Sequence, residues 1–144
     1  MAKRTSKAAA APAAAAARFT DNGDETVTDT RTGLTWSKET LAAGKINHAD
    51  AVKACKALRL AGHKDWRLPT VEELFALADH SRNSPAIDTD AFPDTKSDWY
   101  WTSTLTAWDP SCAWLVGFSY GCAGNYLRND LAFVRAVRSA RASQ

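Results

Sequence analysis

Two helical patterns in the middle of the chain are the feature that most constrains its fold. Residues 47–62 and 69–80 carry apolar side chains at helical spacing, with Gly62 as a stop for the first. Thr70 and Glu73 form a capping-box pattern at the start of the second. Two strand patterns precede the helices, at Val27 and at 34–36, with a turn at Thr32–Gly33 between them. Three further strand patterns follow the helices, at 99–104, 113–119 and 132–138. This order predicts an α+β domain whose N- and C-terminal strands share one small antiparallel sheet.

The length of 144 residues suits a single domain with tails. Residues 1–18 are basic and rich in alanine, Pro12 interrupts them, and we expect a flexible tail. A signal peptide is the less favoured alternative, because the segment lacks a Leu-rich apolar stretch. We therefore place the folded domain at residues 19–138 and a short C-terminal tail at 139–144.

Composition excludes some partners and leaves others open. The net charge of +2 favours neither nucleic acid nor an anionic membrane surface as a partner. No apolar run approaches the roughly 20 residues that a membrane-spanning helix needs, so we expect no insertion into a membrane. Four of the six tryptophans lie between Trp99 and Trp114. Such a concentration of amphipathic rings is typical of a tightly packed small core or of a recognition surface.

The three cysteines form no Cys-x-x-Cys pair. Cys55 lies among apolar residues of the first helical pattern and is expected to be a buried small hydrophobe. Cys112 and Cys122 leave two alternatives. Free thiols are favoured because the sequence shows no other secretory feature, and a loop disulfide would require an oxidising compartment.

Charged residues near both ends of the domain have structural explanations. The acidic turn from Asp21 to Glu25 is typical of ordinary turn chemistry, which is favoured over a calcium site because the spacing of an EF-hand is missing. Arg135 and Arg138 lie on the last strand, where we expect them to pair with acids or to extend along the surface. No metal site is predicted.

Catalytic side chains do not form a recognisable constellation. His48, His63 and His80 stand beside no nucleophile motif. Glu72 and Glu73 are neighbours on a helix, and their side chains diverge by about 100°. The sequence therefore predicts no enzyme and no cofactor.

The segment AWLVGFSYGCAGNYLRND, residues 113–130, begins as a strand and then shows no structural preference. Alternation predicts that Trp114, Val116 and Phe118 face the core, together with Trp101. Leu115, Gly117 and Ser119 then share the outward face, although they have no common size, polarity or β propensity. Rigid aromatic residues among Ser, Gly and Asn are the mixture found in antibody paratopes. After residue 96 the chain has no Lys, Glu or Met, and its Gln is the last residue.

Four segments together resemble a known family: FTDNGDETVTDTRTGLTW, AVKACKALRLAGHKDWRLPTVEELFALAD, FPDTKSDWYWTST and FVRAVR. The family is a bacterial and phage C-type-lectin-like domain named after the C-terminal domain of a Legionella collagen-like adhesin. It is related to the fold of formylglycine-generating enzymes. The resemblance extends from Phe19 to Arg138, and the D-W-R-L-P-T block is its most specific mark. It implies a C-type-lectin-like fold.

The C-terminal part also resembles the variable proteins of diversity-generating retroelements. In those systems, adenine-directed mutagenesis rewrites chosen codons, often AAC, in the last strands and loops of such a domain. Randomising the first two bases of AAC yields Gly, Ser, Tyr, Cys, Asn, Leu, Asp or Pro, but never Lys, Glu, Gln or Met. The positions that this resemblance implies as diversified and ligand-binding are Leu115, Gly117, Ser119, Tyr120, Cys122, Gly124, Asn125, Tyr126, Leu127, Asn129, Asp130 and Leu131. An earlier group comprises Leu105, Trp108, Asp109, Pro110, Ser111 and Cys112, and Trp108 departs from the pattern because AAC cannot yield Trp.

Two related activities are not supported. The chain is much shorter than formylglycine-generating enzymes, and its cysteines lie in the variable-looking region. Calcium-dependent lectins carry E-P-N or Q-P-D with W-N-D, and only the segment 128–130 comes close.

The sequence thus favours a binding module whose diversified surface contacts an unknown protein or cell-surface ligand, with Tyr120, Tyr126 and Trp108 as apolar anchors. The alternative is a structural or adhesive domain of a larger assembly without a diversified site. Homo-oligomerisation and attachment to a larger particle are both compatible with the sequence. A virion, a cell surface and the cytoplasm remain equal alternatives for its location.

Overall fold

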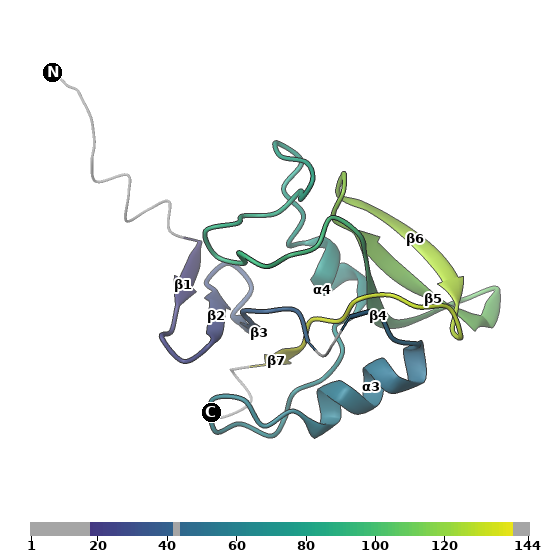
Figure 1. Ribbon diagram of the computed structural model, residues 1–144, viewed down its shortest axis with the longest axis horizontal. Coiled ribbons are helices and arrows are strands. Elements are labelled where there is room, and N and C mark those ends of the chain that lie inside the picture. Colours follow the sequence, from purple (N-terminus) through teal and green to yellow (C-terminus); the bar gives the residue numbers. More distant parts are fainter. Residues whose placement is uncertain (1–17, 42–43, 140–144) are drawn as a thin grey trace, which may run out of the picture.

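The computed structural model describes residues 18–41 and 44–139, which form an α+β domain with two antiparallel sheets (Figure 1). The first sheet has the order β1-β2-β3-β7, so strands from both ends of the chain lie in it. Its strands are β1 (Phe19–Asp21), β2 (Thr26–Asp29), β3 (Leu34–Ser37) and β7 (Val137–Ser139). The prediction that the two ends meet in one sheet is confirmed. Gly33 provides the turn between β2 and β3, with a φ of 80° that favours glycine.

The second sheet has the order β4-β5-β6 and holds most of the predicted site residues. It consists of β4 (Trp99–Thr106), β5 (Asp109–Gly117) and β6 (Cys122–Leu127). All of its pairings are antiparallel, and the β4–β5 register is shifted by irregularities after Trp101. In Figure 1, β6 lies at the outer side of this sheet.

Both helices begin where the sequence places them and are shorter than predicted. Helix α3 (His48–Ala57) is capped by Asn47, whose side chain accepts from the N–H of Asp50. It ends early because Leu58 is extended. Helix α4 (Val71–Phe75) starts at the predicted capping box of Thr70 and Glu73. Beyond Phe75 the chain tightens into i→i+3 turns and then leaves the helix axis, since the N–H of Asp79 bonds to the carbonyl of Ala86.

The connection between the helices, residues 65–70, is tied to distant parts of the domain. Asp65 accepts from the guanidinium of Arg138 at 2.7 Å. Arg67 makes two parallel bonds to the carboxylate of Glu73, at 2.8 and 2.9 Å. Asp65 and Arg67 of the D-W-R-L-P-T block therefore make structural contacts.

The predicted strand at 132–138 is only partly correct. Ala132 pairs with Ile46, Phe133 lies beside Tyr100 of β4, and the chain joins β3 only from Val137 onward. The segment passes from one sheet to the other, so it cannot remain paired with a single strand. The boundaries also shift slightly, because Ser139 belongs to β7 and Arg18 pairs with Asp29 at 2.6 Å. The remaining tail residues lie outside the described residues.

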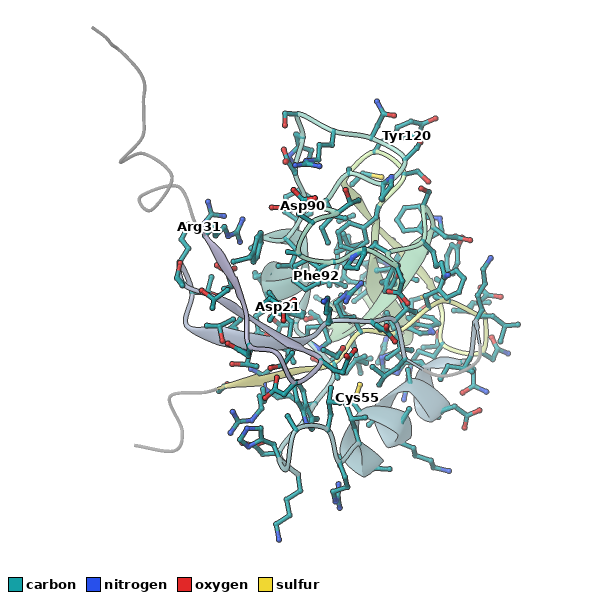
Figure 2. All side chains as sticks on the ribbon, turned by 60° about the vertical axis from the view of Figure 1, so that its left-hand side comes forward. Asp21, Arg31, Cys55, Asp90, Phe92 and Tyr120 are labelled. Atoms are coloured by element: carbon teal, nitrogen blue, oxygen red, sulfur yellow. The ribbon has the colours of Figure 1, made fainter. Side chains whose placement is uncertain are left out.

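Apolar side chains pack on both faces of β5, in two clusters. Val116 and Phe118 join the first cluster with Trp36, Leu74 and Phe92. The second cluster lies on the opposite face, under α3, and contains Ala113, Leu115, Trp101, Cys55, Trp66 and Leu68. Burial raises the pKa of the Cys55 thiol to about 12, and the prediction of a buried small hydrophobe is confirmed (Figure 2).

Arg135 is fully buried between the two sheets. Its Nη1 donates to the carbonyls of Ser37 and Lys38, both at 2.7 Å, and its Nη2 donates to Thr95 Oγ1 at 2.8 Å. The guanidinium also lies 4.7 Å from the ring centre of Phe92. Both arginines pair with acids, as expected: Arg138 with Asp65 at 2.7 Å and Arg135 with Asp94 at 3.9 Å. The shorter bonds of Arg135 go to the backbone carbonyls at the end of β3 and fix that end.

Helix α3 is held against β4 by His48. Its Nε2 lies 2.9 Å from the carbonyl oxygen of Thr102, so this nitrogen carries the proton and donates. Its ring packs edge-on against Trp101 at 5.1 Å, and its Nδ1 is buried without a partner among the described residues. Burial lowers the pKa of His48, because a second proton on Nδ1 would place a charge where no acceptor faces it.

We expect His48 to make the fold sensitive to mild acid. The unfolded chain has the higher histidine pKa, so it binds more protons as the pH falls through about 6.5, and stability decreases there. In His48→Gln, the amide can still donate to Thr102 but does not titrate. Urea denaturation at about pH 7.5 and about pH 5.5 should show a loss smaller by about 1 kcal/mol in this variant than in the wild type. His63→Gln, outside the core, is the control, and equal losses in wild type and His48→Gln would contradict the assignment.

Candidate functional site

Exposed large apolar side chains concentrate in the predicted site. Within the described ranges, six such residues are exposed: Phe75, Leu105, Trp108, Tyr120, Leu127 and Leu131. All except Phe75 belong to the positions that the sequence singled out. Trp108 and Tyr120 are the most accessible, at 67% and 74%. Single exposed apolar residues are ordinary, but their concentration in one part of the chain indicates a contact surface.

Trp108 lies at the turn between β4 and β5 and packs edge-on against Trp114, with ring centres 5.7 Å apart. Trp114 is therefore half-buried at the surface, and its predicted place in the core is wrong. Across β6, Asn125 stands opposite Trp114, and Leu127 stands opposite Cys112. These five residues form one partly apolar surface, which we call the Trp108 surface.

Hydrogen bonds within the turn hold the backbone beneath Trp108. The carboxylate of Asp109 accepts from the N–H and the hydroxyl of Ser111, at 3.0 and 2.7 Å. These bonds, the one from the hydroxyl above all, lower the pKa of Asp109. Thr106 and Asp109 are joined by a further bond from hydroxyl to carbonyl. The side chain of Asp109 therefore serves the turn, while Pro110 remains exposed.

The loop after β6 lies beside this turn. The N–H of Arg128 bonds to the carbonyl of Ser111 at 2.9 Å, and the N–H of Asp130 bonds to the carbonyl of Leu127. A shallow depression of about 300 Å³ lies between Ser111, Leu127, Arg128 and Asn129. Predicted site residues Asn129, Asp130 and Leu131 are all exposed here.

Tyr120 lies at the opposite end of the sheet, in the turn between β5 and β6 (Figure 2). The carbonyl of Ser119 accepts from the N–H of Ser84 at 2.7 Å, and the carbonyl of Gly121 lies 2.6 Å from Nε2 of His80. His80 therefore holds this turn and does not end a helix. The turn is fixed by backbone atoms while the Tyr120 ring projects outward.

Cys112 and Cys122 lie near opposite ends of the sheet. Cys112 and Gly117 are five positions apart along β5, which corresponds to about 17 Å. Cys122 stands opposite Gly117, so Cys112 and Cys122 lie at different ends of the ladder. A disulfide needs Cα atoms within about 7 Å, which excludes this pair, and all three cysteines are free. Cys122 itself is exposed.

Leu115 and Gly117 were expected to face outward, and this expectation is wrong. Leu115 is fully buried under α3, and Gly117 is buried against the ring of Trp99. A Cβ at Gly117 would lie 2.9 Å from that ring, and one at Gly124 would lie 3.1 Å from it. These positions shape the packing of Trp99 and cannot contact a ligand directly. The large apolar side chain of Leu115 was the signal available in the sequence.

The side chain of Tyr126 also packs against other residues of the domain. Its ring lies 5.9 Å from that of Trp99 and 6.4 Å from that of Trp101, and its side chain is half-buried. The expectation that it acts as a surface anchor equal to Tyr120 is therefore corrected. Ser119 is half-buried as well, and its hydroxyl donates to the carbonyl of Ser97 at 2.8 Å.

A cavity of about 460 Å³ lies outside these positions, between β1 and residues 77–91. Figure 2 labels Asp21, Arg31 and Asp90 from its lining. The carboxylate of Asp21 accepts from the N–H of Gly23 at 2.9 Å, as expected for turn chemistry, and also pairs with Lys38 at 2.8 Å. In residues 18–41 and 44–139, no group of three or more His, Cys, Asp or Glu side chains is placed to hold a metal ion. No helix of these same ranges is long and apolar enough to cross a bilayer.

The model of the Lcl C-terminal domain family matches residues 25–138, which is well over half of the chain. The chain belongs to this family. The match contains both helices, the segment 65–70, the whole β4–β5–β6 sheet, and the first sheet except β1 and Ser139. No curated protein matches the chain. Membership of the Lcl C-terminal domain family therefore stands on the whole folded unit and assigns no role to single residues.

We expect the two tyrosines to separate in a stability measurement. Tyr120→Ala removes an exposed ring and should leave the melting temperature within about 1 °C, since surface substitutions are usually near neutral. Tyr126→Ala removes contacts with two tryptophans and should lower it by about 4 °C or more. Thermal unfolding followed by circular dichroism compares the two variants directly. Equal changes in melting temperature would mean that both rings are exposed or that both are packed within the domain, and would contradict this assignment.

Gly117→Ala should destabilise the domain by about 1–3 kcal/mol, because the new methyl group meets the ring of Trp99. The cost should fall markedly when the ring is absent. Measuring the same substitution in a Trp99→Leu background by urea denaturation completes a double-mutant cycle. A cost that is identical in both backgrounds would exclude the Trp99 contact as its cause.

Proposed function

We propose that this protein is a C-type-lectin-like binding module that recognises a protein or cell-surface ligand and performs no chemistry of its own. Recognition would use the side chains at the two ends of the β4–β6 sheet, above all Trp108 and Tyr120. The observation that carries the proposal is the concentration of exposed large apolar residues at predicted site positions. Static binding needs only such side chains on a rigid backbone, without a cofactor or a metal.

The frame beneath these side chains supports the proposal. The turn that carries Tyr120 is held by the carbonyls of Ser119 and Gly121, which are present whatever the side chain. The turn that carries Trp108 is held by the bonds among Thr106, Asp109 and Ser111. Substitution at Tyr120 or Trp108 therefore leaves the backbone path in place. Rigid aromatic anchors on a fixed backbone lose little entropy on binding.

We further propose that the exposed positions are diversified by retroelement mutagenesis. Packing removes three residues from the positions that we expect to be diversified, namely Leu115, Gly117 and Gly124. Variation at these residues would disturb the packing of the domain. The exposed remainder consists of residues that AAC codons can yield, apart from Trp108. The positions that we expect to vary are Leu105, Pro110, Ser111, Tyr120, Cys122, Asn125, Leu127, Asn129, Asp130 and Leu131.

Sequencing the gene and its genomic surroundings in sister isolates tests this proposal. We expect a reverse-transcriptase gene nearby, an adenine-rich near-copy of codons 105–138, and substitutions confined to codons of the exposed set. Codons 114, 115, 116 and 118 serve as the internal control and should stay unchanged. Identical sequences at the exposed codons, with no template copy, would support the alternative of a structural or adhesive domain.

A further inference from the structure

The outer edge of β6 is left unprotected. Other edges of the two sheets are occupied: Trp101 donates to the carbonyl of Phe133 along β4, and Arg67 exchanges two bonds of 2.9 Å with Val137 along β7. Strand β1 has only three residues and ends in Asp21. In contrast, β6 has six residues, CAGNYL, with no charge, no proline and no break in its register. Natural proteins usually protect the edge of a sheet by covering it, by keeping the edge strand short, or by placing a charge, a proline or a bulge on it.

Alternation of the β5–β6 ladder shows which backbone groups point outward. The N–H of Arg128 bonds to the carbonyl of Ser111, so the backbone groups of Arg128 point toward β5. Because this direction alternates along a strand, the backbone groups of residues 122, 124 and 126 point toward β5 as well. The backbone groups of Ala123, Asn125 and Leu127 therefore point away from the sheet. Among the described residues, the N–H and carbonyl of Ala123 and Asn125 have no hydrogen-bond partner.

Strand β6 carries an apolar projection at one end and an apolar depression at the other, four residues apart. Leu127 projects at one end and is 51% exposed. At the other end, an apolar depression of about 220 Å³ is lined by Ala123, Val71, Glu72 and Phe75. Residues 123 and 127 lie on the same face of the strand because side chains alternate. A projection and a hollow on one strand fit each other only across a two-fold axis midway between them, at Asn125.

We propose that two copies of this chain associate by antiparallel pairing of their β6 strands, centred on Asn125. Asn125 of each copy then stands opposite Asn125 of the other, and Leu127 of one copy enters the depression beside Ala123 of the other. About six backbone hydrogen bonds form between the outward-facing residues. The uncharged strand offers no repulsion to its own copy, and the two sheets become one that continues through the axis.

This association would place both Trp108 surfaces on the same face of the joined sheet. A ligand with two sites, or a surface with many, would then meet two sets of side chains, which raises the overall affinity by effective concentration. A monomer would leave the expected pattern of variable codons unchanged, and an invariant gene would leave the dimer unaffected. Asn125 and Leu127 are also positions that we expect to vary, so the apolar contact depends on this chain's own side chains, whereas the backbone pairing does not.

Sedimentation equilibrium of the full chain at increasing concentration tests the pairing. We expect a reversible monomer–dimer equilibrium. Leu127→Asp should raise the dissociation constant at least about tenfold, because a carboxylate would enter an apolar hollow beside Glu72. Ala123→Lys should also weaken the dimer by filling that hollow. Leu131→Asp, at an exposed leucine outside β6, is the matched control and should leave the equilibrium unchanged.

The double variant Ala123→Lys with Leu127→Asp identifies the register. Within one chain the two positions are about 14 Å apart, too far for an ion pair. Across the proposed axis they are directly opposite, so the double variant should recover the affinity that each single variant loses. Failure of the double variant to recover it would overturn the register centred on Asn125.

A cross-link provides a second measurement. Cα atoms of directly opposed, hydrogen-bonded residues lie about 5.5 Å apart, which suits a disulfide. Asn125→Cys, with Cys112→Ser and Cys122→Ser, should form a covalent dimer under mild oxidation, whereas Tyr120→Cys in the same background should not. If the protein stays monomeric and gives no cross-link, the proposed self-pairing is overturned. The β6 edge would then be available to a strand of another protein.

Discussion

Residues 132–139 are the constraint on which the rest of the structure depends, because this one segment contacts both sheets. Ala132 bonds to Ile46, Phe133 extends the outer side of β4, and Val137 enters the sheet of the N-terminal strands. Between them, Arg135 is buried on the carbonyls that end β3. Two of the three guanidinium nitrogens find acceptors, which offsets the cost of burying the charge, while Nε has no partner among the described residues. The segment thus joins the two small sheets into one unit.

This construction determines where the molecule can contact a partner. Apolar clusters on both faces of β5 bury Ala113, Leu115 and Val116, while Trp114 stays half-buried at the surface. Exposed side chains remain at its two turns and along β6. The accessible residues are therefore those whose backbone is held by turns and ladder bonds and whose side chains contribute little to the core. A surface of this kind can change its side chains without a large loss of stability.

Family membership and the proposed function rest on different observations. The match to the Lcl C-terminal domain family covers residues 25–138 and singles out no residue. Within it, Asp65 bonds to Arg138 and Arg67 bonds to Glu73, and these contacts secure the fold. The proposed recognition depends instead on exposed side chains such as Trp108 and Tyr120.

The sequence by itself determined the elements and much of their order. The capping box at Thr70, the turn at Gly33 and the meeting of the terminal strands all follow from local chemistry and from the order of patterns. The exposed set was largely predictable too, since Trp108, Tyr120 and Leu127 stand in segments without structural preference. Local patterns suffice for these features because hydrogen bonds in turns and caps are made within a few residues.

Only the tertiary structure decided which face of β5 is covered and which glycines are structural. Alternation assigns residues to two faces but does not say whether both faces are buried, and here α3 and the last segment cover the face of Leu115. Gly117 and Gly124 look unconstrained until the ring of Trp99 is placed over them. The separation of Trp108 from Tyr120, and the unprotected edge of β6, likewise depend on strand pairing between residues far apart in the chain. Burial and pairing of this kind are set by distant contacts, which no local pattern contains.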